Sequence, residues 1–220
     1  MLSLIIFIPL IAALGLLMVS RDNTAMIKVV GVGAAGASLS LSLWLLFSFD
    51  TASSEMQFIQ MFHWVPALHI NYLVGVDGIS LWMVVLTSFL GLIAILFSFN
   101  QKEGFRNFMS LMLALEAGTL GVFLALDTIL FYVFWELMLV PTYFLIGVWG
   151  EGRRVYATMK FVIFTLVGSL LMLVAILSLT MIHYGATHDV TFDLRMLTHT
   201  HIDPATQLSL IHISEPTRPY

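Results

Sequence analysis

Six stretches of about twenty mostly apolar residues follow one another along this chain, and they constrain its fold more than any other feature. An α-helix rises about 1.5 Å per residue, so roughly 20 apolar residues cross the ~30 Å hydrocarbon core of a bilayer. The expected spans are 2–20, 29–49, 80–99, 108–126, 128–149 and 161–184. The first span lacks the basic leader and clear cleavage site of a signal peptide, so we interpret it as a retained helix.

The composition is that of an all-α, polytopic integral membrane protein. Of the 220 residues, 60% are hydrophobic and 10% are charged, whereas soluble domains usually have about 45–50% apolar and about 25% charged residues. The mean hydropathy is +0.98. No basic arm indicates a nucleic-acid partner. The absence of cysteine excludes disulfides, thiolate metal sites and iron–sulfur ligation by this sequence.

Basic residues predict the orientation of the spans. Lys and Arg occur around the first, third and fifth connections, whereas the second and fourth connections have none. The residues concerned are Arg21, Lys28, Lys102, Arg106, Arg153, Arg154 and Lys160. Positive charge marks the cytoplasmic side of a membrane protein, so we expect the N-terminus and the segment after the sixth span to lie outside.

These spans suggest a division into helical and external segments. Two N-terminal membrane helices occupy 1–49, and an external loop at 50–79 has aromatic residues with some period-two alternation, which suggests a small hairpin. Four further membrane helices occupy 80–184, and a second external loop is expected at 185–207.

Two patterns resemble ligand-binding motifs without the context that such motifs need. Gly31, Gly33 and Gly36 match G-x-G-x-x-G, but they lie inside a membrane span without a strand–turn–helix setting, so close helix packing is the better interpretation. His199 and His201 have no third ligand nearby, and we interpret them as part of a solvated loop with no metal.

Glu136 is the strongest candidate for chemistry. It lies eight residues into the fifth span, or about 12 Å deep. A charge at a helix centre costs roughly 2.5–3.5 kcal/mol, so we expect this carboxylate to be protonated or to face a cation or water, as in a proton relay. Pro141, five residues later, predicts a kink near Leu137. A purely structural hydrogen bond is the alternative role for Glu136.

Other ionisable residues are weaker candidates. Glu116 is a second intramembrane carboxylate, in the fourth span, and Gly118 and Gly121 after it permit close helix contact. Asp127, at the turn between the fourth and fifth spans, lies near the outer interface. Lys160 lies at a cytoplasmic helix end, where a topology anchor is as good an interpretation as a supporting relay role.

Several strings in this sequence resemble the M-type antiporter-like membrane subunits of bacterial respiratory complex I (NADH:quinone oxidoreductase), the counterparts of mitochondrial chain four. The string around Glu136 is the most specific, and the resemblance extends from about residue 1 to about residue 207. The strings are Leu115–Gly118, Gly121–Asp127 and Phe131–Pro141, with Val76–Ser80 including Asp77, and Lys160–Thr165 followed by Gly168 and Ser169.

The resemblance implies part of an antiporter-like inverted-repeat fold in the bacterial inner membrane. It implies that Glu136 pairs with a lysine of a seventh, broken helix, and that the subunit translocates protons alongside other membrane subunits. NADH, flavin, iron–sulfur clusters and quinone (ubiquinone or a relative) then belong to partner subunits, and this chain holds no cofactor or redox site. Related subunits of multi-subunit cation/proton antiporters or membrane-bound hydrogenases are alternatives. A non-conducting membrane scaffold is a further one.

The end of the chain departs from this family. We expect an N-terminal fragment that lacks the seventh helix and its lysine. The segment 208–220 resembles a translated sequencing-library adapter, and we expect it to be non-native, although a natural polar loop is the alternative.

Overall fold

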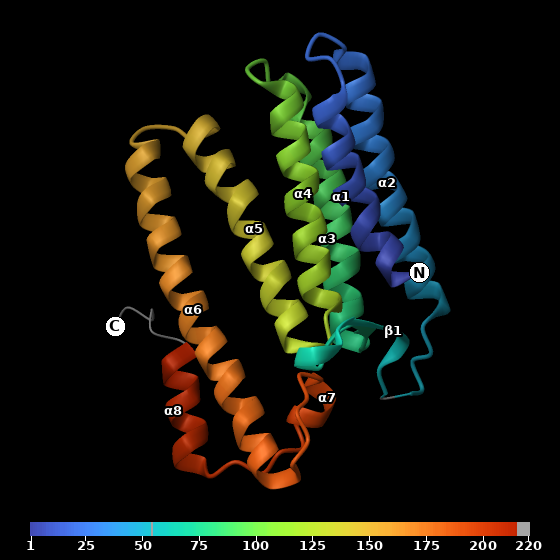
Figure 1. Ribbon diagram of the computed structural model, residues 1–220. Coiled ribbons are helices and arrows are strands. Elements are labelled where there is room, and N and C mark those ends of the chain that lie inside the picture. Colours follow the sequence, from blue (N-terminus) through green and yellow to red (C-terminus); the bar gives the residue numbers. More distant parts are fainter. Residues whose placement is uncertain (54, 215–220) are drawn as a thin grey trace.

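Long helices that run alternately in opposite directions make up most of the computed structural model, which describes residues 1–53 and 55–214 (Figure 1). The helices are α1 Leu2–Met18, α2 Thr24–Ser48, α3 Gly78–Phe97, α4 Phe105–Leu124, α5 Thr128–Trp149, α6 Arg154–Thr187, α7 Leu194–Leu197 and α8 Pro204–Ser214, with short 3-10 turns η1 Pro66–Leu68 and η2 Ser98–Asn100. The strands are β1 Gln57–Val65 and β2 Ile70–Val76.

The helices match the six expected spans and confirm the polytopic all-α fold. Five of them, α2 to α6, are long and apolar enough to cross a membrane. With 17 residues, α1 is shorter, and its rise of roughly 26 Å falls a little below the hydrocarbon thickness. By contrast α6 has 34 residues, or roughly 51 Å, because it begins at Arg154 rather than near 161 and so extends beyond the bilayer.

The two ends of the bundle differ in charge. Figure 1 shows the α1–α2, α3–α4 and α5–α6 connections at one end, and these carry the basic residues from which the orientation was predicted. The β-hairpin, the α4–α5 turn and α7 lie at the other end. We call these the basic end and the hairpin end.

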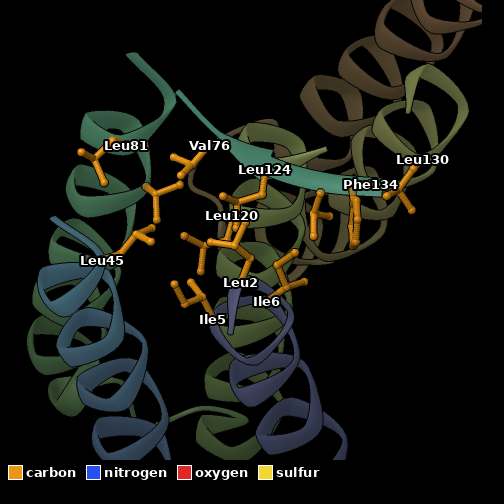
Figure 2. Close-up of a cluster of buried hydrophobic side chains, with 12 residues drawn as sticks. Leu2, Ile5, Ile6, Leu45, Val76, Leu81, Leu120, Leu124, Leu130 and Phe134 are labelled. Atoms are coloured by element: carbon orange, nitrogen blue, oxygen red, sulfur yellow. The ribbon is translucent and has the colours of Figure 1, made fainter. Parts of the chain in front are cut away.

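The hairpin covers a buried apolar cluster in the α1–α5 bundle. Strands β1 and β2 pair antiparallel, within the segment 50–79 for which a hairpin is expected. Beneath them, side chains from α1 to α5 and from β2 pack together (Figure 2). The labelled members are Leu2, Ile5, Ile6, Leu45, Val76, Leu81, Leu120, Leu124, Leu130 and Phe134. Because this one cluster contains residues of five helices, it holds α4 and α5 in a fixed position relative to each other.

Glycines allow close contact at some helix crossings but not at others. A Cβ atom on Gly31 would lie 2.7 Å from Cε of Met109 on α4, so α2 approaches closely there. A Cβ atom on Gly33 or Gly36 would meet nothing within 4 Å, so the packing interpretation of the glycine pattern holds for Gly31 alone. Gly118 and Gly121 face Met138 and Phe134 of α5, as expected for a tight α4–α5 pair.

The C-terminal segment folds back onto α6. His183 of α6 shares a 2.7 Å hydrogen bond with the Thr200 hydroxyl, and the amide of Leu194 donates to the carbonyl of Leu126. The expected loop at 185–207 therefore contains α7 and the beginning of α8. Helix α8 also crosses position 207, where we expected native sequence to end. Residues 215–220 of the expected non-native tail lie outside the described residues.

Candidate functional site

Glu136 lies on the side of α5 that points away from α4. Phe134 and Met138 face the α4 glycines, and each is two residues, or about 200°, away from Glu136 around the helix. Glu136 lies eight residues after Thr128 and therefore about 12 Å from the hairpin end. The carboxylate thus lies near the middle of α5, and its interaction with Tyr132, which also interacts with Ser169 of α6, places it on the α6 side.

The Glu136 side chain is half-buried and incompletely paired. Its Oε1 is buried and has no hydrogen-bond partner among the described residues. Tyr132, one helical turn earlier, interacts with the Glu136 carboxylate and with Ser169 of α6. Among the side chains that the structure describes, those of residues 1–53 and 55–211, the one ion pair joins Arg195 and Asp193, so none of their basic groups neutralises Glu136. A carboxylate oxygen without a donor at this depth can accept a proton or a cationic partner.

Pro141 lies inside α5, one turn beyond Leu137. Because proline has no N–H, the Leu137 carbonyl loses its usual helical donor. The Thr142 hydroxyl donates to the neighbouring Met138 carbonyl at 2.7 Å. Next to Glu136, the helix thus offers a carbonyl oxygen that can bind water.

Glu116 packs against a different helix from Glu136. It is 5% exposed, and both carboxylate oxygens are buried without a hydrogen-bond partner among the described residues. Its carboxylate lies against Gly91 of α3, where an added Cβ would be 2.7 Å from the Glu116 Cδ. Glu116 therefore faces α3 whereas Glu136 faces α6, and the structure does not bring the two carboxylates together.

Asp127 connects the start of α5 to strand β2 at the hairpin end. Its Oδ1 accepts from the amides of Ile129 and Leu130 at the start of α5, and its Oδ2 accepts from the amide of Asn71 in β2 at 3.0 Å. Burial raises the pKa of Asp127, these amide donors oppose the rise, and the negative charge of Asp193 adds to it. These contacts give Asp127 a clear structural role, as the cap of α5 and the anchor of the hairpin.

Asp77 and Lys160 lie toward opposite ends of the molecule. Asp77 caps α3 through the amides of Ile79 and Ser80, and the Ser80 hydroxyl accepts from the Asp77 amide. Burial raises the pKa of Asp77, but the hydrogen bonds from Ser80 and Ile79 outweigh it and lower the pKa overall. Lys160 is exposed, six residues into α6 at the basic end, which suits an anchor that reaches toward the membrane surface.

Two residues lie beside the carboxylates in a way that the sequence did not predict: Gly91 beside Glu116, and Tyr132 beside Glu136. A third, Ser169, interacts with Tyr132. Tyr132 precedes Glu136 by four residues, and this spacing, which puts both side chains on one face of a helix, is the sequence signal that could have predicted their contact. Gly91 and Ser169 lie on other helices, and no local pattern connects them to a carboxylate. Among the described residues, no three His, Asp or Glu side chains are arranged to hold a metal ion.

Comparisons with known proteins identify relatives of this chain. Residues 125–213 match the family described as NADH:quinone oxidoreductase/Mrp antiporter, TM, which includes part of the segment expected to be non-native. Subunit M of the F(420)H(2) dehydrogenase of Methanosarcina mazei is 38% identical over 198 residues, covering 89% of this chain and 39% of that protein. Subunit M of the NADH-quinone oxidoreductase of Rhodobacter capsulatus is 42% identical over 197 residues, covering 87% and 38%.

Solved structures have the same arrangement of helices. A chain of respiratory complex I from Thermus thermophilus with bound NADH superimposes with a TM-score of 0.81 at 27% identity, covering 97% of this chain and 43% of that one. A chain of the Mrp complex from Dietzia shares the fold, with a TM-score of 0.72 at 20% identity, over 97% and 23%. The chain thus spans less than half the length of each of these relatives.

Proposed function

The chain belongs to the family of antiporter-like membrane subunits found in NADH:quinone oxidoreductases, and from this we propose that it is part of a proton-translocating subunit driven by redox chemistry elsewhere in its complex. The observation that carries the proposal is Glu136, an incompletely paired carboxylate at mid-membrane depth beside Pro141. Among the solved structures, the identity is 27% to the chain of respiratory complex I and 20% to the Mrp chain, and this difference favours an electron-transfer complex over a separate antiporter.

We further propose how Glu136 acts. A cation supplied from outside the described residues approaches the α5–α6 side, where Glu136 has a free buried oxygen. When the cation is close, the carboxylate stays ionised, and when the cation moves away, desolvation favours proton uptake. Tyr132, which also interacts with Ser169, positions the carboxylate, and the Leu137 carbonyl can hold a water that carries the proton.

The electron donor and its cofactors belong to partners under this proposal. Two named relatives are subunits of complexes with different donors, F(420)H(2) and NADH, and both resemble this chain closely. NADH or a similar donor, flavin, iron–sulfur clusters and quinone would bind other subunits, in a bacterial cytoplasmic membrane. Transport and redox chemistry would then be coupled through contacts between subunits.

The test is Glu136→Gln in the assembled complex, in inside-out vesicles. We expect proton pumping, followed by quenching of an acridine dye, to fall at least tenfold, because glutamine cannot release a proton. The matched control is Glu116→Gln, for which a milder loss is expected because Glu116 lies in a separate contact. Normal pumping by the Glu136 variant, with normal assembly, would instead establish a non-conducting scaffold.

A further inference from the structure

Two hollows meet at the basic end of the bundle, away from both carboxylates. One, of about 270 Å³, is lined by Arg21, Lys102 and Arg106. The other, of about 480 Å³, lies between α1, α4 and α5. Gly104, Arg106 and Asn107 line both hollows, so the two hollows lie side by side with a shared wall, and we call them together the basic-end groove.

The first hollow carries positive charge that the chain does not neutralise. Neither Asp22 nor Glu103, the nearest acids in the sequence, lines either hollow. None of the three basic side chains forms an ion pair in the described part of the chain. Arg106 is held in place, because its guanidinium donates to the carbonyls of Leu17 and Val19 and to Asn107. One of its five N–H groups is left for a ligand.

The second hollow has an apolar wall that faces the membrane. Leu17, Phe144 and Val148 are between 44% and 49% exposed in this wall. Trp149 closes its edge, and its indole N–H donates to the Glu103 carbonyl at 2.8 Å. A tryptophan at this level is typical of the membrane–water interface. The groove thus has a charged part at headgroup depth and an apolar part that continues into the hydrocarbon.

We propose that the basic-end groove binds an anionic phospholipid. The phosphate contacts Arg21, Lys102 and the free N–H of Arg106, and one acyl chain lies along Leu17, Phe144 and Val148. Basic pockets between membrane helices on the cytoplasmic side suit anionic headgroups. Charge complementarity selects this occupant over a neutral lipid, because a zwitterionic headgroup would add its own positive charge to the three uncompensated cations of the groove.

The test compares two lipids on the purified full chain by native mass spectrometry. Phosphatidylglycerol and phosphatidylcholine with identical acyl chains are added at equal concentration. We expect phosphatidylglycerol adducts to dominate. The double variant R21Q/K102Q should reduce this preference about tenfold to thirtyfold, because each of the two lost basic residues contributes a similar factor to the binding of an anionic headgroup. The matched control, R153Q/K160Q, removes two charges from the same end outside the groove and should keep the preference.

A second variant tests the apolar part independently. Val148→Trp should fill the groove and reduce adducts of both lipids, while circular dichroism shows an unchanged helix content. Equal retention of the two lipids by the unmodified chain would overturn the proposal. An equal loss of preference in the control double variant would also overturn it, because diffuse surface charge and not a built site would then be responsible. If another subunit covers the groove, phosphatidylglycerol will be absent from the assembled complex, and the proposal fails.

Discussion

Replacing Asp127 by alanine should destabilise the hairpin end of the molecule more than any other single change to an acidic residue. Asp127 is 1% exposed and accepts three backbone N–H groups, two at the start of α5 and one from Asn71. Loss of a helix cap costs about 0.5–2 kcal/mol. Leaving the partly buried Asn71 amide without an acceptor costs about 1–3 kcal/mol more. We therefore expect a total loss of about 2–4 kcal/mol.

The assay for Asp127→Ala is unfolding in mixed micelles with increasing dodecyl sulfate, followed by tryptophan fluorescence and circular dichroism. Asp127→Asn should cost less, about 1–2 kcal/mol, because its amide oxygen can still cap α5 while the Asn71 donor loses its acceptor. Asp77→Ala removes the partly buried cap of α3 and serves as a comparison at about 1 kcal/mol. A change below about 0.5 kcal/mol for Asp127→Ala would refute this reasoning. Loss of proton pumping by Asp127→Asn without any loss of stability would assign Asp127 to the proton pathway instead.

Two further changes test the packing and the charge state of other carboxylates. Gly91→Ala should displace the Glu116 carboxylate and cost about 1–3 kcal/mol, whereas the same change in a Glu116→Ala background should cost almost nothing; equal costs would show that the two residues do not meet. Because the pKa of Asp77 is lowered in the folded chain, its stabilising effect is full above the ordinary aspartate pKa and is lost as the pH falls through the lowered value. Asp77→Asn should remove that part of the acid dependence of unfolding, and an unchanged dependence would contradict the assigned hydrogen bonds.

The sequence is sufficient to predict most of the helical architecture. An apolar run of about twenty residues predicts a membrane helix whatever the details of tertiary packing. The turns at Asp22 and Asp127 mark clear boundaries between successive helices. The ends of the helices are less predictable, because α6 continues as a helix through charged residues where no hydrocarbon is needed. Helix α8 was not expected, since its sequence has no amphipathic or apolar signal that distinguishes a helix from a loop.

The site is only partly predictable for a different reason. Depth along a helix follows from counting residues, so Glu136 lies eight residues after the start of α5, as the sequence indicates. Glu116 lies eleven residues after the start of α4, and not eight, because α4 begins at Phe105. The direction of a side chain around the helix depends on which neighbours pack against it. Phe134 and Met138 occupy the α4 contact and thereby turn Glu136 toward α6, while Gly91 makes room for Glu116 on α3. These relations join residues far apart in sequence, and a single sequence carries no signal for them.

Water access to position 136 is the most direct test of a proton pathway at this site. The chain has no cysteine, so Glu136→Cys introduces its only thiol. Leu86→Cys is the matched control, because Leu86 lies eight residues into α3 from the same end, at the same depth, and is 49% exposed on the lipid-facing surface. Labelling by a small methanethiosulfonate reagent, which needs the thiolate and hence water, is measured by mass spectrometry of each peptide in the assembled complex. We predict at least tenfold faster labelling at position 136 than at position 86, and equal rates would contradict a hydrated relay at Glu136.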